Sequence, residues 1–170
     1  MSKNGAVDPL PPIRFADILF ANVTDPNGKN PKTRRVVVLT PDLALKARYP
    51  IVVAGVTGTL PDPLTADYVL LPFKNSPGRH PKTGMTKKAA VLCTWIIIIT
   101  ESDVQGRSRF VHPSYMVIVS SKTETTAKAV GGWPWSIMIM LRESVLPMGG
   151  TPFTAAIVGQ ADRRPQLGLR

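Results

Sequence analysis

The sequence predicts a mainly β protein with a minor share of α-helix, folded as a small, strongly bent antiparallel barrel with one or two short helices. Short runs of β-branched and aromatic residues recur along the first hundred positions, and glycine- and proline-rich turns separate them. Few stretches carry the three- to four-residue spacing of a helix. At 170 residues the chain supports one domain, which we place at residues 13–103.

Five strands are expected in this domain. The first ends at the segment Asp25-Pro-Asn-Gly28, a strong turn signal because Asn and Gly tolerate positive φ. Pro41 closes the second strand, and residues 43–49 form a single helical turn before the third. Pro72 places the fourth strand at a sheet edge, since proline lacks the amide hydrogen that an inner strand donates. The strands are expected at residues 13–23, 35–40, 51–56, 67–73 and 89–99.

Outside the barrel domain the patterns are weaker. Residues 1–12 hold prolines and glycine without periodicity and are expected to form a flexible arm. Residues 104–160 are interpreted as a C-terminal extension, with a strand at 115–120 and a helix at 137–146. The tail, residues 161–170, is expected to be disordered.

The amino-acid composition indicates which kinds of partner and ligand the protein binds. The net charge of +10 and a pI near 10.2 favour a polyanion, and clustering of the basic residues in loops favours a nucleic-acid site over general solubility. With one cysteine, Cys93, and two histidines, His80 and His112, the chain has no internal disulfide and no expected metal site or cofactor. A reducing cytoplasm fits this usage. The longest apolar run, residues 91–99, falls short of the roughly 20 residues that span a bilayer.

Basic and hydroxyl-bearing side chains gather where the expected strands begin and end. Two adjacent arginines open the second strand, and the third runs into Thr57-Gly-Thr59, which together suggest a phosphate cradle. A basic loop precedes the fifth strand, and two lysines lead into that strand. The basic side chains concerned are Lys32, Arg34, Arg35, Arg79, His80, Lys82, Lys87 and Lys88.

Over residues 13–100, four segments in the same order and spacing resemble the MazF/PemK family of toxin endoribonucleases. The chain has an opening strand at 15–20, a glycine-containing basic loop that ends in Arg34 before the strand 36–40, and a third strand that ends at Thr57. The fourth segment, 83–88, resembles the family's small-Gly-Leu-x-Lys motif. Each segment alone is weak, so the resemblance depends on their combination.

The resemblance implies a compact SH3-like barrel, of the kind shared by the CcdB and PemK groups, with a C-terminal helix and usually a homodimer. It also implies metal-free cleavage of single-stranded RNA and inhibition by a cognate antitoxin protein. Arg34 matches the family's catalytic arginine and Thr57 its loop threonine. The remaining candidates are assigned to RNA binding: Lys32, Arg35, Thr59, Arg79, His80, Lys82, Lys87 and Lys88.

Several alternatives stay open. Thr57 is either a catalytic hydroxyl or one that stabilises its own turn, and Arg35 is either a second phosphate contact or a solvated side chain. Some members of the family carry an acidic or histidine residue in the loop before the arginine, and some carry an Arg-x-Asp-type pair on the strand after the lysine segment. Both features are absent here, so the general base is unidentified. Asp17 and Asp25 are candidates for it, each with a structural reading as a turn or strand-end carboxylate.

The missing base keeps two other functions open. One is a barrel that has lost catalysis and binds nucleic acid or a partner protein; the other is a gyrase-poisoning toxin of the CcdB type. Three tryptophans, Trp95, Trp133 and Trp135, either stack on RNA bases or belong to a core or interface, as tryptophan more often does. Cys93 is expected to be a buried strand residue.

Overall fold

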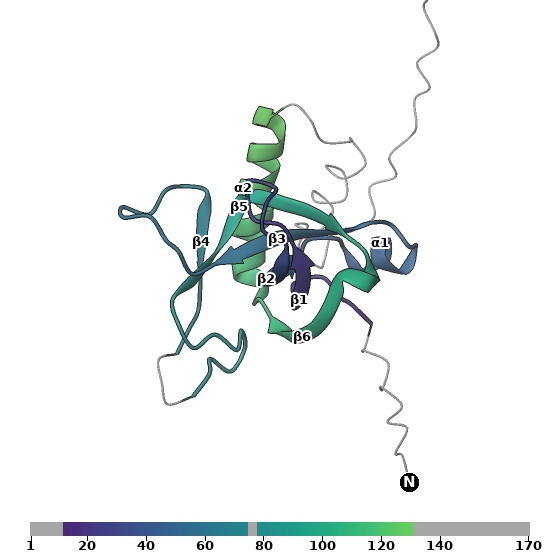
Figure 1. The fold of residues 1–170 in the computed structure, drawn as a ribbon, viewed down its shortest axis with the longest axis horizontal. Helices are drawn as coiled ribbons and strands as arrows, with labels where there is room; N and C mark the ends of the chain where they lie inside the picture. Colours follow the sequence, from purple (N-terminus) through teal and green to yellow (C-terminus); the bar gives the residue numbers. More distant parts are fainter. Residues whose placement is uncertain (1–11, 75–77, 131–170) are drawn as a thin grey trace, which may run out of the picture.

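The computed structural model describes residues 12–74 and 78–130, which form one antiparallel sheet and two α-helices (Figure 1). In chain order the strands are β1 (Asp17–Val23), β2 (Lys32–Val38), β3 (Ile51–Thr57), β4 (Tyr68–Leu71), β5 (Ala89–Ile99) and β6 (Val104–Phe110). The helix α1 (Asp42–Lys46) joins β2 to β3, the 3-10 turn η1 (Glu101–Asp103) joins β5 to β6, and α2 (Pro113–Val130) follows β6.

The six strands lie in the order β4-β5-β3-β2-β1-β6, and every pairing is antiparallel. The mainly β class is therefore confirmed, as is the expected edge position of the strand that precedes Pro72. The fifth strand was predicted with its observed bounds, Ala89–Ile99, because its apolar run is long and unbroken. The first strand begins at Asp17, later than expected, since Asp17 accepts a hydrogen bond from the amide of Arg14 (2.7 Å) and closes a turn there.

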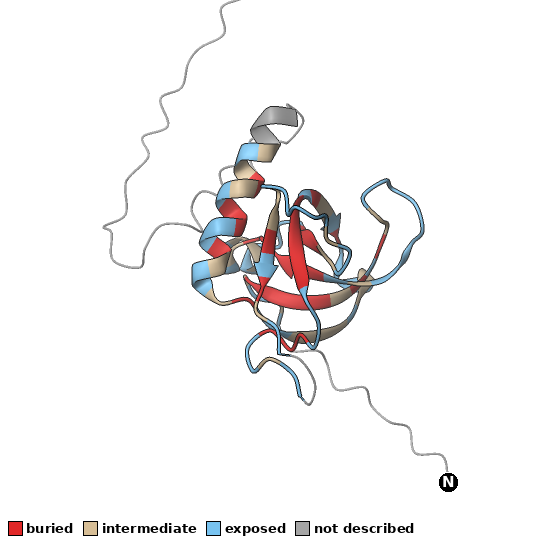
Figure 2. Cartoon of the chain, turned by 90° about the vertical axis from the view of Figure 1, so that its left-hand side faces the viewer, coloured by how far each residue is buried: buried red, intermediate tan, exposed pale blue. Residues whose placement is uncertain are grey.

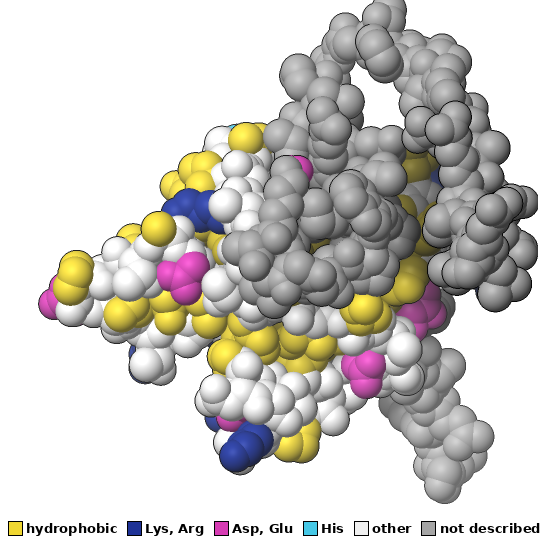
Figure 3. Space-filling view, turned by 90° about the horizontal axis from the view of Figure 1, so that it is seen from above, with side chains coloured by type: hydrophobic (Ala, Val, Ile, Leu, Met, Phe, Trp, Pro, Cys, Tyr) yellow, Lys and Arg dark blue, Asp and Glu magenta, His cyan; other side chains and the backbone are white. Residues whose placement is uncertain are grey.

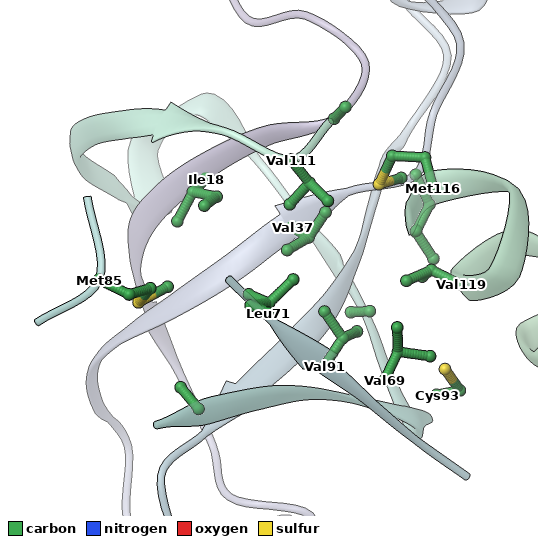
Figure 4. Close-up of a cluster of buried hydrophobic side chains, with 14 of the residues drawn as sticks. Ile18, Val37, Val69, Leu71, Met85, Val91, Cys93, Val111, Met116 and Val119 are labelled. Carbon is green, nitrogen blue, oxygen red and sulfur yellow. The ribbon is translucent and has the colours of Figure 1, made fainter. Parts of the chain in front are cut away.

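Alternating side chains of the same strands enter two cores on opposite faces of the sheet. The helix-side core contains Ile18 and Val37 and is covered by α2 through Met116 and Val119 (Figure 4). The second core contains the intervening side chains, among them Leu19, Val36, Val38 and Trp95. Because both faces are covered, β2 reads as a continuous apolar run after its arginines. Figure 2 shows the buried residues concentrated in the sheet and on one side of α2.

The prediction of a strand at 115–120 is wrong, because these residues lie within α2. The buried side chains of α2 follow helical spacing, at Met116, Val119, Ser120 and Thr123. The β-branched run at 117–119 suggested a strand, but tertiary packing overrides that local preference. The boundary expected after Asp103 does not divide the sheet, since β6 pairs with β1 and α2 packs on β5 and β4.

Other expectations fall on residues that the structure does not describe. These are most of the N-terminal arm, the helix at 137–146, the tail, and two of the three tryptophans, Trp133 and Trp135. Within the described part of the chain, no helix is long and apolar enough to cross a membrane.

Candidate functional site

A cleft of about 380 Å³ lies where the start of β2, the end of β3 and the approach to β5 come together. Antiparallel pairing explains the meeting, because it places the first residues of β2 and β5 beside the last residues of β3. Segments far apart in sequence thus meet at one end of the three neighbouring strands. The cleft is lined by Phe20, Thr33, Arg34, Arg35, Val56, Gly58, Met85, Thr86, Lys87, Lys88 and Ala89.

Among the described residues that line it, the cleft carries four basic side chains and no acidic one. Arg34 and Arg35 belong to β2, whereas Lys87 and Lys88 are exposed and lie just before β5. Cations gathered in a concave surface create a positive potential that attracts an anion. The cleft is therefore suited to bind a phosphate.

Arg34 is half-buried and held from two sides. Its Nη2 donates a hydrogen bond to the carbonyl oxygen of Asn30 (3.2 Å), and its guanidinium carbon lies 5.6 Å from the centroid of the Trp95 ring. The Nε is buried and has no hydrogen-bond partner among the described residues. The terminal nitrogens are thus the part of Arg34 that can meet a ligand in the cleft.

The loop between β1 and β2 positions the carbonyl that Arg34 contacts. Asp25 accepts hydrogen bonds from the amides of Asn27 (3.0 Å) and Lys29 (2.9 Å) and from Nδ2 of Asn30 (2.9 Å). These bonds, first among them the one from Lys29, lower the pKa of Asp25, and the charge of Arg34 lowers it further. Asp25 is therefore an ionised loop anchor, consistent with the turn reading of this carboxylate.

Arg35 has a different environment from its neighbour. It is exposed, and its guanidinium carbon lies 5.2 Å from the centroid of the Phe20 ring, the residue opposite it on β1. Arg34 and Arg35 thus lie over rings on opposite faces of β2, as strand alternation predicts. Both still line the cleft, because it opens at the end of the strand.

The hydroxyl of Thr57 is engaged in its own turn. It accepts a hydrogen bond from the amide of Thr59 (3.1 Å) and lies 3.3 Å from the carbonyl oxygen of the same residue. Val56 and Gly58 line the cleft, whereas Thr57 and Thr59 do not. The observed geometry is that of a turn-stabilising hydroxyl beside the cleft.

The basic loop before β5 stands apart from the cleft. The Nδ1 of His80 accepts from the amides of Lys82 (3.4 Å) and Thr83 (3.3 Å), so this ring organises the local turn. Arg79 and Lys82 are exposed, as is Lys32 at the first position of β2. None of these four side chains lines the cleft.

Sequence reasoning missed Thr33, Thr86, Phe20 and Met85 as lining residues. The two threonines each precede a basic pair directly, which was a usable signal. Phe20 and Met85 resemble ordinary core residues in sequence, and only the fold brings them to the cleft.

The other candidate base, Asp17, serves the fold. It is buried and forms an ion pair with Arg107 of β6, with 2.5 Å between its Oδ1 and Nη2. Burial raises the pKa of Asp17, while the amide of Arg14 and the guanidinium of Arg107 oppose that shift. Among the described residues, no group of three or more His, Cys, Asp or Glu side chains is placed to hold a metal ion.

Comparison with known proteins finds solved structures with a similar fold. No family model and no curated protein matches the sequence. Among solved structures, an endoribonuclease in complex with its cognate antitoxin, from a mycobacterial species, aligns with a TM-score of 0.51 and 11% identity, over 72% of this chain and 99% of that one. The Mycobacterium tuberculosis toxin MazF-mt6 aligns with a TM-score of 0.49 and 17% identity, over 66% and 96%. The six-stranded antiparallel sheet with its two helices is thus a MazF/PemK-like fold.

Proposed function

We propose that this protein is a toxin-type endoribonuclease that cleaves single-stranded RNA by attack of the RNA's own 2′-hydroxyl, without a metal. The observation that carries the proposal is a cleft on a MazF/PemK-like fold whose described lining includes Arg34, Arg35, Lys87 and Lys88 and no acidic residue. Four cations suit a chain of phosphates, and a cleft of about 380 Å³ suits a piece of unpaired strand.

In the proposed reaction the 2′-oxygen forms a bond to the adjacent phosphorus, and the bond from phosphorus to the 5′-oxygen breaks. The products are a 2′,3′-cyclic phosphate and a free 5′-hydroxyl. The 2′ proton leaves to a base, and the departing 5′-oxygen takes up a proton. Arg34 stabilises the negative charge that grows on the non-bridging oxygens, because its planar guanidinium pairs with phosphate and stays charged.

The remaining candidates take supporting roles in this proposal. Arg35, Lys87 and Lys88 bind the phosphate backbone inside the cleft. Lys32, Arg79 and Lys82 are exposed beyond it and extend the basic surface along the RNA strand, and His80 shapes the loop that holds Arg79 and Lys82. Thr57 acts on the scissile phosphate only if its hydroxyl leaves the Thr59 turn, and Thr59 serves that turn.

A second candidate function is a barrel that binds RNA without cutting it. It is favoured by one observation: the described residues that line the cleft include no histidine, aspartate or glutamate to accept the 2′ proton. Binding and cleavage therefore need separate measurement.

The test is incubation of the purified protein with a long single-stranded RNA in excess EDTA. We expect discrete fragments with cyclic-phosphate ends, and none from Arg34→Ala. Arg48→Ala is the matched control, because Arg48 is an exposed arginine that lines a different cleft. Intact RNA from folded wild-type protein that still binds RNA would instead support the non-catalytic barrel. An equal loss of activity in Arg48→Ala would show that the effect of Arg34→Ala is not specific to the cleft.

The partners belong to the same proposal. The solved endoribonuclease is bound to its cognate antitoxin, and we extend this to an antitoxin protein for the present chain. We also propose a homodimer and a cytoplasmic site of action, which the family resemblance implies.

A further inference from the structure

The indole ring of Trp95 packs in a space that is open only because residue 55 is a glycine. A Cβ atom built on Gly55 of β3 would lie 1.9 Å from Cε3 and 2.2 Å from Cδ2 of the indole, far inside any tolerated contact. The ring therefore lies flat against the backbone of the neighbouring strand. A bulge makes this possible, because the β3–β5 register steps from Ala54 opposite Ile96 to Val56 opposite Val91 and leaves Trp95 beside Gly55.

The same ring reaches across β3 to Arg34 on β2. Gly55 pairs with Val36, and Arg34 is the next side chain along β2 on that face. The guanidinium carbon of Arg34 is 5.6 Å from the ring centroid, within the range of a cation–π contact. Trp95 is only 6% exposed, so the ring is fixed while the arginine remains at the cleft.

We propose that Trp95, seated on Gly55, is a positioning residue that fixes the guanidinium of Arg34 for its phosphate ligand. The inference rests on the proposed function. A carboxylate would also hold the arginine, but it would cancel the charge that the phosphate needs. The face of an aromatic ring orients the cation and leaves its charge and its terminal donors in place.

The neighbouring hydrogen bonds agree with this role. Arg34 has one hydrogen bond to protein, from Nη2 to the carbonyl of Asn30, and the structure gives it no ion pair among the described residues. Its Nε is buried and has no hydrogen-bond partner in the described part of the chain, and the same holds for the Nε1 of Trp95. The ring and one carbonyl thus fix the position of the side chain. The conformational entropy of this long arginine is therefore lost on folding, before RNA binds.

The experiment is a double-mutant cycle with Trp95→Leu and Arg34→Ala, measured as affinity for a 2′-deoxy-substituted oligonucleotide that cannot be cleaved. We expect Trp95→Leu to weaken binding roughly tenfold, about 1.4 kcal/mol, in the wild-type background and to have no further effect with Arg34→Ala. Trp95→Phe, which keeps an aromatic face, is expected to retain most of the affinity. Val53→Ala is the control, since Val53 is fully buried in the same core.

A second readout does not involve RNA. The Nε–H proton of Arg34 is expected to show a ring-current shift in the NMR spectrum that is lost in Trp95→Leu and kept in Val53→Ala. The positioning role would be overturned if the losses of binding free energy in Trp95→Leu and Arg34→Ala add in the double mutant. It would also be overturned if the Arg34 signal is unchanged in Trp95→Leu. If RNA is neither bound nor cut but the Arg34 signal responds as expected, the proposed function fails and the positioning of Arg34 by Trp95 stands.

Discussion

Arg34 and Arg35 are adjacent in sequence but differ in how firmly they are held. Arg34 is half-buried against the fixed ring of Trp95, while Arg35 is exposed over Phe20, which is itself only partly buried. A side chain that is already ordered loses less entropy when it binds a ligand. For the proposed reaction, Arg34 is therefore the better suited of the two to stabilise a transition state, and Arg35 to attract the RNA backbone.

Cys93 gives a prediction about a single buried thiol. It lies in the helix-side core, where burial raises its pKa from 9.0 to about 11, against smaller opposing effects of Thr123 and Lys122. Between pH 9.0 and about pH 11 the thiol of the native state keeps a proton that the unfolded chain releases. The free energy of unfolding therefore falls as pH rises through this range. Each pKa unit is worth about 1.4 kcal/mol.

We expect urea unfolding of the wild type to lose more stability between pH 8 and pH 11 than unfolding of Cys93→Ala does. The comparison removes the contribution of lysines and tyrosines, which both proteins share. Native protein should also react slowly with a thiol reagent at pH 8 and quickly once unfolded. Parallel pH dependence in the two proteins would show that the thiol is not protected in this way.

The helix α2 gives a prediction about one element. Met116 faces the helix-side core and is 1% exposed, while Val117 is 49% exposed on the other side of the helix. Met116→Ala should cost about 2–5 kcal/mol of unfolding free energy, because it leaves a cavity. Val117→Ala should stay within about 0.5 kcal/mol, as surface substitutions do. Denaturant melts measure both, and equal costs would contradict this assignment of helix faces.

This helix also shows where sequence reasoning stops. The strand β5 was predicted correctly because its run is rich in β-branched and aromatic residues, which favour a strand over a helix. The run at 117–119 has two interpretations, and the choice depends on β5 and β4 lying beneath it, which no local pattern contains. For the site, Arg34, Arg35, Lys87 and Lys88 were predictable from charge at strand starts. The contact of Trp95 with Arg34 was not, since it depends on a bulge between distant strands.

Across the whole molecule the positive charge is unevenly placed. The chain carries a net charge of +10, and in the part that the structure describes four cations line one cleft without an acidic residue in the lining. On the face seen from above, the visible Lys and Arg side chains lie in separate groups divided by hydrophobic and uncharged atoms (Figure 3). A local site and a diffuse positive surface therefore predict different behaviour toward RNA.

Salt dependence separates these two modes of binding. Each phosphate neutralised on a single strand contributes a slope of about −0.7 to log affinity against log salt, because bound counterions are released. If Arg34, Arg35, Lys87 and Lys88 carry the binding of a short uncleavable oligonucleotide, the total slope should be about −3. Lys87→Ala should reduce its magnitude by about 0.7, whereas Lys46→Ala should leave it unchanged, since Lys46 is exposed on α1 beside another cleft. A much steeper slope that is indifferent to Lys87 would mean that RNA is held by the charge of the whole surface.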